Sequence, residues 1–344
     1  MASDPNLPDT EAVASWCTDN VPGFRGPVRL EKFATGQSNP TYRLHAASGD
    51  YVLRRKPSGR LLKSAHAVGR EFHVQRALSG TGVPVAHMHM LCEDDGVIGS
   101  SFYVMDFVNG RHFDDPRLPG LSPDERRALM DEMNRVLVAI HKLDLEAAML
   151  CDFGPEGNYY RRQIDRWTAQ YRASETETIP AMDDLIAWLD ENTPVDDGLR
   201  TLVHGDFRID NLLFAPDGPA CAAVLDWELS TLGHPFSDLA SVLMRWRRPQ
   251  GPLGRGLAGV DRKALGLPED RAFIDLYCAR MGLPGVENLG FSLAFAFFRM
   301  AAILQGVKKR ALDGNASNPE RALEIGGHIP GFAEQGLAAA DEIW

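Results

Sequence analysis

The sequence has few cysteines, and none of them form a metal-binding or disulfide pattern. The five cysteines are scattered over 344 residues, are odd in number and include no C-x-x-C pair. Disulfide frameworks and structural zinc sites use cysteines at short, regular spacings. The pattern therefore argues against both and indicates reduced thiols, as in a cytoplasmic protein.

The chain also has no excess of positive charge, and from its N-terminal pattern we expect no secretory leader. Its N-terminus has no basic-then-apolar pattern, and 36 basic against 47 acidic residues leave a net charge of −11. This balance argues against nonspecific binding to nucleic acid or to an anionic membrane. The most apolar region, 289–307, is interrupted by Arg299 and Gln305, so we expect a buried helix and no membrane partner.

What the sequence does contain is a dense set of polar residues between 201 and 240, TLVHGDFRIDNLLFAPDGPACAAVLDWELSTLGHPFSDLA. Two short apolar runs around a Pro-Asp-Gly-Pro turn predict a β-hairpin. That hairpin would bring Asp226 back beside Asp206 and Asn211. Two carboxylates and an amide, without cysteine or clustered histidine, suit a hard cation such as Mg²⁺ and an oxygen nucleophile.

The order H-x-D-x-x-x-x-N, followed by apolar residues and Asp, resembles the phosphoryl-transfer core of the kinase fold. The HGDxxxxN and D-W forms present here are similar to the aminoglycoside phosphotransferase-like family. The resemblance implies that Asp206 is the base that takes the substrate hydroxyl proton, with Asn211 and Asp226 as Mg²⁺ ligands. His204 opens this catalytic motif, and Asp238 matches the family's buried acid that ties down the catalytic loop.

The same resemblance implies a nucleotide-binding turn near the N-terminus. The segment from Arg29 reads as strand, turn and strand, with Gly36, Ser38 and Asn39 in the turn. In the kinase-like architecture, backbone N–H groups and a hydroxyl at this place cover the phosphates of ATP. The G-x-S-N pattern taken alone would fit a turn in any β-ribbon.

The next strand carries the basic residue of the site. Two-residue alternation places Val52, Arg54 and Lys56 on one face. The kinase fold has a phosphate-binding lysine here, and the matching position in this chain is Arg54, which can hold phosphate bidentately. Lys56 could share or take that role. Glu71, on a helix predicted from about 65 to 78, matches the family glutamate that pairs with the strand residue.

The resemblance implies a hinge where the first lobe ends. Met105 would border the adenine, and the backbone of Asp106 and Val108 would hydrogen-bond its edge. We therefore expect an α+β, protein-kinase-like bilobal fold. Residues 1–108 would form a small, mostly antiparallel β lobe with one main helix, and 109–344 a large, mostly helical lobe with the catalytic loop and substrate site.

The spacing after the hairpin indicates the class of substrate. Eleven residues separate Asp226 from Asp238, which is too short for the activation segment with which protein kinases dock peptides. Within the family, the motifs LRRKPSGRLL, GNYYRRQI and LDWELSTLG most resemble phosphotransferase domains associated with acyl-CoA dehydrogenases. The resemblance implies ATP- and Mg²⁺-dependent phosphorylation of a small-molecule hydroxyl, such as that of a hydroxyacyl-CoA.

Two other hypotheses stay open at the level of sequence. An aminoglycoside-type antibiotic kinase would need an acid-lined cleft, and the C-terminal sequence has no obvious acidic cluster. A nucleotide-binding pseudoenzyme would have lost its base or metal ligands, and only the arginine at position 54 departs from the pattern. Arg162 and Arg166 are candidates for contact with an anionic substrate, although they fit a solvated helix face as well. The chain would be a monomer or homodimer.

Overall fold

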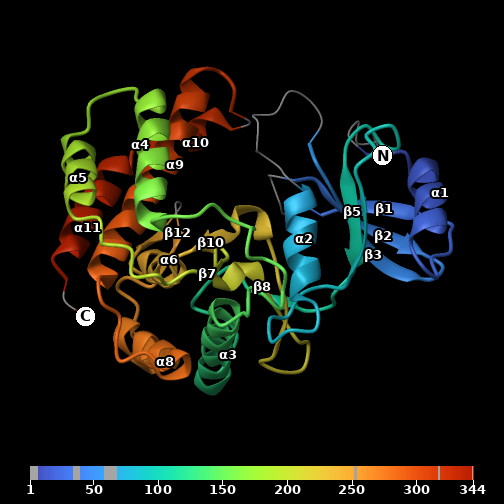
Figure 1. Cartoon of the computed structure of the whole chain (residues 1–344), viewed down its shortest axis with the longest axis horizontal. Coiled ribbons are helices and arrows are strands. Elements are labelled where there is room, and N and C mark those ends of the chain that lie inside the picture. Colours follow the sequence, from blue (N-terminus) through green and yellow to red (C-terminus); the bar gives the residue numbers. More distant parts are fainter. Residues whose placement is uncertain (1–6, 34–38, 58–67, 252–253, 317, 343) are drawn as a thin grey trace. The chain divides into compact units, whose positions relative to one another are not determined.

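The computed structural model of the chain describes residues 7–33, 39–57, 68–251, 254–316, 318–342 and 344 (Figure 1). The chain divides into two compact units. The first comprises Met1–His112, Glu146–Leu150 and Asn211–Ser230, and the second comprises Phe113–Leu145, Cys151–Asp210 and Thr231–Trp344.

A five-stranded antiparallel sheet forms the body of the first unit. The strand order is β1-β2-β3-β5-β4, and every neighbouring pair is antiparallel. The strands are β1 (Arg29–Lys32), β2 (Thr41–Ala46), β3 (Gly49–Arg55), β4 (Met88–Cys92) and β5 (Phe102–Asp106).

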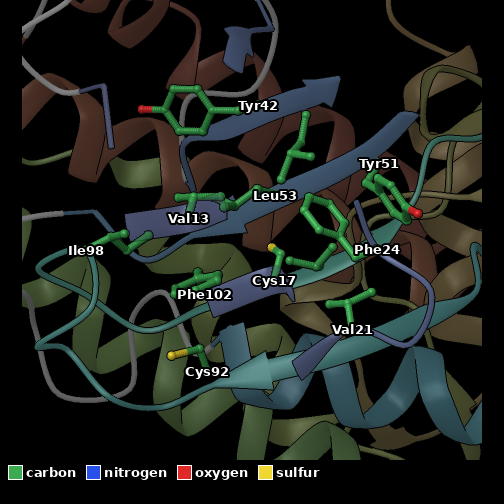
Figure 2. Packing of buried hydrophobic residues seen from close by; sticks show 12 residues of the cluster. Val13, Cys17, Val21, Phe24, Tyr42, Tyr51, Leu53, Cys92, Ile98 and Phe102 are labelled. Atoms are coloured by element: carbon green, nitrogen blue, oxygen red, sulfur yellow. The ribbon is translucent and has the colours of Figure 1, made fainter. Parts of the chain in front are cut away.

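Two helices cover opposite faces of this sheet (Figure 1). Helix α1 (Thr10–Asn20) packs Val13 and Cys17 against buried strand residues such as Leu53 and Phe102 (Figure 2). Helix α2 (Val68–Leu78) shares its apolar cluster with Tyr103, the neighbour of Phe102. Successive strand residues therefore face different helices, as the period of two requires.

Two neighbouring residues, Asp9 and Thr10, are of types that can cap the start of α1. Asp9 is the N-cap, and its carboxylate accepts hydrogen bonds from the N–H groups of Glu11 and Ala12 at 2.9 and 3.3 Å. Both residue types can cap a helix, but a carboxylate also interacts favourably with the positive end of the helix dipole. The expected start of α2 falls within 58–67, outside the described residues.

The predicted hairpin is present in the first unit. It consists of β8 (Leu212–Phe214) and β9 (Cys221–Val224), and β6 (Arg111–His112) extends it to three strands in the order β6-β8-β9. Because β8 pairs with β6, and Val224 N–H donates to Pro84 O at 2.9 Å, the hairpin belongs with the first hundred residues. The two units thus interleave along the chain. The division expected from the sequence, after Val108, would instead make each lobe one continuous segment.

The second unit is mostly helical and is built around α9 (Leu289–Leu312). This helix packs against α4, α5, α6, α10 and α11. It is long and apolar enough to cross a membrane, but 67% of its most apolar window is buried, so the prediction of a buried core helix is confirmed. The other helices are α3 (Pro123–His141), α4 (Tyr159–Ser174), α5 (Pro180–Glu191), α6 (Phe236–Trp246), α7 (Arg262–Leu265), α8 (Asp270–Met281), α10 (Pro319–Gly326) and α11 (Ile329–Ala340).

Two small antiparallel pairs complete the second unit. Strands β7 (Thr201–Val203) and β10 (Thr231–Gly233) pair with each other, as do β11 (Gln250–Gly251) and β12 (Gly254–Arg255). Strand β7 leads directly into the HGDxxxxN motif, and β10 leads into α6. An antiparallel β unit and a mostly helical unit make the fold α+β, as predicted.

Candidate active site

Arg54 on β3 is surrounded by three carboxylates of the first unit. Its Nε lies 2.8 Å from Oε2 of Glu71, its Nη2 donates to Asp226 Oδ1 at 3.0 Å, and Glu228 Oε2 is 3.7 Å away. Only 13% of the Arg54 side chain is exposed. One guanidinium cannot neutralise three carboxylates, so this cluster, which we call the acidic cluster, carries surplus negative charge when all four groups are ionised.

Glu71 has further partners that fix its position. Asn39 Nδ2 donates to Oε1 at 2.6 Å, and the Tyr103 hydroxyl donates to Oε2 at 3.1 Å. Burial raises the pKa of Glu71 above its ordinary value of 4.5, although Arg54 opposes this shift. Burial also acts to lower the pKa of Arg54, but Glu71 together with Tyr103, Asp226 and Glu228 outweighs it and the pKa is raised. Arg54 is therefore charged at every physiological pH.

The hairpin register brings Asn211 and Asp226 to the same end of β8 and β9. Leu212 pairs with Val224, and Leu225 N–H donates to Asn211 O at 2.8 Å, which places Asn211 next to Asp226 in the strand pairing. Asp226 has left-handed backbone angles (φ 63°, ψ 60°), a conformation uncommon for residues other than glycine and often found at functional sites. The buried indole of Trp227 anchors this turn by donating to Val224 O at 3.0 Å.

The oxygen ligands available at this end of the hairpin suit Mg²⁺. An amide oxygen and a carboxylate are hard ligands, and Mg²⁺ commonly uses one or two carboxylates together with water and substrate phosphates. Among the described residues, no group of three or more His, Cys, Asp or Glu side chains is arranged to hold a metal ion. Asn211 and Asp226 can therefore hold Mg²⁺ only when other oxygens complete its coordination.

In the second unit, Asp238 organises the loop that follows β7. Its carboxylate accepts the backbone N–H groups of His204 and Gly205 at 2.7 and 2.8 Å. Gly205 has φ +82°, a conformation that other L-residues adopt at a cost. Burial acts to raise the pKa of Asp238, but the hydrogen bond from His141, at 3.4 Å, helps to hold it below the ordinary value.

Asp206 lies in this loop between two arginines. Arg208 Nε donates to Oδ2 at 3.1 Å, and Arg245 Nη2 donates to Oδ1 at 2.5 Å. Burial acts to raise the pKa of Asp206, but Arg245 and Arg208 outweigh it and hold the pKa below 3.8. His204 Nδ1 accepts the Asp206 N–H at 3.2 Å. His204 is wholly buried, so its ring packs within the loop.

The positions expected to bind nucleotide are described only in part. Gly36 and Ser38 lie outside the described residues, and the Asn39 side chain is committed to Glu71. Met105 and Asp106 end β5, and Val108 follows it. Asp106 N–H donates to His87 O at 2.9 Å, so this group is not available to the edge of a purine.

A model of the phosphotransferase enzyme family matches residues 29–264. The chain belongs to the phosphotransferase enzyme family. A crystal structure from Ralstonia eutropha JMP134, described as a candidate aminoglycoside phosphotransferase, is 49% identical with a TM-score of 0.89, covering 97% of this chain and 98% of that one. Aminoglycoside phosphotransferase APH(4)-Ia, in complex with AMP-PNP and hygromycin B, is 17% identical with a TM-score of 0.63, covering 96% and 99%. It shares the fold.

Curated relatives of this phosphotransferase include two mouse (Mus musculus) proteins. Acyl-CoA dehydrogenase family member 10 is 50% identical over 85% of this chain and 27% of its own length. Acyl-CoA dehydrogenase family member 11 is 41% identical over 96% of this chain and 43% of its own length. The chain thus spans less than half the length of each, and matches a phosphotransferase portion of a longer protein.

Several site residues of this phosphotransferase were not found by sequence reasoning. Glu228 stands in the D-W-E sequence but was not recognised as a third carboxylate beside Arg54. Arg245 follows Asp238 by seven residues, or two turns of α6, so a shared helix face was a usable signal. Arg299, whose Nη2 donates to Gly205 O at 2.9 Å, left no local signal because this contact joins distant segments.

The two arginines expected to face substrate lie in different surroundings. Arg162 lines a cavity of about 480 Å³ in the second unit and donates to the carbonyls of Glu156 and Gly157. Arg166 is not among the residues that line this cavity, and its guanidinium lies 5.5 Å from the centre of the Trp167 ring. The interpretation as a partly solvated helix face fits Arg166 better.

Proposed function

We propose that this phosphotransferase is an ATP- and Mg²⁺-dependent kinase that phosphorylates a hydroxyl group of a small molecule. The observation that carries the proposal is the geometry around Asp206, whose loop is fixed by two backbone hydrogen bonds to Asp238. The paired oxygen ligands Asn211 and Asp226 add support. All three positions that a pseudoenzyme would be expected to lose are retained.

Asp206 would align the acceptor. Its low pKa keeps the carboxylate ionised at neutral pH, so it accepts a hydrogen bond from the substrate hydroxyl. The bond from the γ-phosphorus to the bridging oxygen of ATP breaks, a bond to the hydroxyl oxygen forms, and ADP leaves. The hydroxyl proton passes to Asp206. A weak base suffices because the transition state of phosphoryl transfer is loose and depends mainly on positioning and electrostatics.

The remaining residues would bind the nucleotide and its metal. Asn211 and Asp226 would hold Mg²⁺, which when bound neutralises negative charge on the phosphates. Arg54 would contact phosphate oxygens, with Glu71 holding it in place. Gly36 and Ser38, which are outside the described residues, would cover the phosphates. Lys56 remains an alternative to Arg54 as the residue that contacts the phosphates. Met105 and Val108 would border the adenine.

The acceptor we propose is a hydroxyacyl-CoA. Its support is that the chain matches portions of proteins named for acyl-CoA dehydrogenases over 85 to 96% of its length. A second candidate is an aminoglycoside, because four carboxylates line the 480 Å³ cavity beside two arginines: Glu156, Asp196, Asp197 and Glu287. Because the chain spans only part of those relatives, both acceptors, the cytoplasmic location and a monomeric or dimeric state stay proposals.

The test is Mg²⁺-dependent transfer of phosphate from γ-labelled ATP to a panel of hydroxyacyl-CoAs and aminoglycosides. Removing a general base typically costs about 10²–10⁴ in rate, so Asp206→Asn should abolish nearly all transfer. Asp275→Asn, an exposed aspartate paired with Arg271 on α8, is the matched control and should keep full activity. Nucleotide binding without transfer to any acceptor, in wild type and variant alike, would contradict catalysis.

A further inference from the structure

A second cavity of the second unit, of about 500 Å³, is lined by five arginines. They come from the catalytic loop, from the end of α6 and the residues after it, from β12 and from α10: Arg208, Arg245, Arg248, Arg255 and Arg321. Among the described residues, the carboxylates that line it are Asp114 and Asp210. We call it the arginine cavity.

Among the described residues in and beside the arginine cavity, arginines outnumber carboxylates. Arg255 pairs with Asp114, Arg208 pairs with Asp210, and Arg208 and Arg245 share Asp206. Three carboxylates thus face five guanidinium groups. Burial, with Arg245 and Arg208 nearby, lowers the pKa of Arg248 to about 10, which agrees with a positive local potential.

The cavity is adjacent to the reacting group. Arg208 and Arg245 line the cavity and also donate hydrogen bonds to the Asp206 carboxylate. An acceptor whose hydroxyl meets Asp206 therefore has this cavity within reach of its neighbouring atoms. Met133, Val242 and Trp246 supply apolar wall, which suits a ligand with both hydrocarbon and charged parts.

We infer that the arginine cavity binds an oxyanion of the acceptor, and that this kinase therefore selects anionic hydroxy compounds over polycationic ones. The inference rests on the proposed function for the position of the hydroxyl. Guanidinium groups bind phosphate and carboxylate bidentately, and several of them around one cavity disfavour an ammonium group. The oxyanion is either a phosphate of a coenzyme A thioester or the carboxylate of a free hydroxy acid.

Calorimetric binding of three probes tests the inference without requiring turnover. The probes are 3-hydroxybutyryl-CoA, 3-hydroxybutyryl-pantetheine and 3-hydroxybutyrate, which carry the same hydroxyl with phosphates, with no charge and with a carboxylate. Each is titrated into protein saturated with Mg²⁺ and ADP, so that the adenine of the CoA ester cannot report on the nucleotide site. Prior titration of Mg²⁺·ADP alone shows whether the proposed nucleotide site exists.

At least one charged probe should bind about tenfold or more tightly than the neutral one, and added salt should reduce the difference. Tighter binding of the CoA ester identifies phosphate as the oxyanion, and tighter binding of the free acid identifies the carboxylate. Equal binding of all three probes by a protein that binds Mg²⁺·ADP would overturn the inference and leave the proposed function intact.

Variants locate the effect in the cavity. Arg248→Gln and Arg255→Gln should each remove most of the preference for the charged probe, and neither residue contacts Asp206 in the hydrogen bonds described. Arg255 is 52% exposed, so its replacement leaves the fold intact even if Arg248→Gln does not. Arg271→Gln, an exposed arginine on α8 outside the cavity lining, is the matched control. An equal loss in all three variants would contradict a site in the arginine cavity.

Discussion

The acidic cluster of the first unit and the arginine cavity of the second carry surplus charge of opposite sign. In the first, one arginine, Arg54, meets three carboxylates. In the second, one carboxylate, Asp206, lies between two arginines of a set of five. Each region leaves a surplus of one sign. On the proposed function, the first would be completed by a cation and the second by an anion.

Arg54→Met removes the positive charge of the acidic cluster and should have the largest effect on stability. It leaves Glu71 buried without its counter-charge, and loss of one partner of a buried pair typically costs about 3–5 kcal/mol. Urea unfolding measures the change. Arg29→Met, which removes an exposed ion pair with Glu31 on the same sheet, is the control and should change little.

A second substitution distinguishes this cause from simple loss of packing. Adding Glu71→Gln to Arg54→Met removes the buried charge and should restore part of the stability. The amide oxygen of the glutamine can still accept from Asn39, and its NH₂ group can donate to the Tyr103 hydroxyl. If the double variant is no more stable than Arg54→Met, the acidic cluster does not act through charge.

Much of the fold was predictable because its signals are local. The Pro-Asp-Gly-Pro turn gives the β8–β9 hairpin, and Ser122, Pro123 and Glu125 give the capping box that starts α3. The family motif also led to the fold class, which the solved structures confirm. These features need only neighbours in the sequence.

What could not be predicted depends on contacts between distant segments. The pairing of β6 with β8 makes the two units interleave, and no periodicity in either strand indicates it. In the same way, Glu228 meets Arg54, and Arg245 meets Asp206, only after the chain has folded. Sequence reasoning therefore named the residues that we propose to react but missed the charged side chains that pair with them.

Asp226→Asn reduces the negative surplus of the acidic cluster at the proposed metal position. The rate of transfer should fall by about 10²–10³, the usual loss when a group that stabilises transition-state charge is removed. Titration with Mg²⁺ should show a higher concentration for half-maximal rate. Asp217→Asn, an exposed aspartate in the turn of the same hairpin, should behave like wild type. An unchanged Mg²⁺ dependence in Asp226→Asn would argue against this ligand.

Gly205→Ala tests the loop that places Asp206. A residue with a Cβ at φ +82° should lower the free energy of unfolding by about 1–2 kcal/mol, and distortion of the loop should lower kcat as well. Gly218→Ala is the control, because Gly218 has no left-handed backbone and open space where a Cβ would lie. Equal stability of the two variants in thermal unfolding would show that the loop does not need a glycine.

The two regions should respond to pH in opposite directions, which is the smallest effect expected. The pKa values of Asp206 and Asp238 lie below 3.8, so their contribution to stability is present above pH 3.8 and is lost as the pH falls further. The pKa of Glu71 is raised above 4.5, so its contribution is complete below that pH and is lost as the pH rises. The free energy of unfolding, measured across pH, tests both assignments. Compared with wild type, Asp238→Asn should lose less stability as the pH falls, and Glu71→Gln should lose less stability as the pH rises. Parallel pH curves would contradict these assignments.

The most direct test of the account is a competition experiment with one labelled ATP pool and two acceptors, a hydroxyacyl-CoA and an aminoglycoside such as hygromycin B. The ratio of phosphorylated products gives the ratio of their kcat/KM values. We expect label to pass to the anionic acceptor in large excess, and we expect Arg248→Gln to reduce the ratio of anionic to aminoglycoside product. Predominant labelling of the aminoglycoside by the wild-type protein would contradict this expectation.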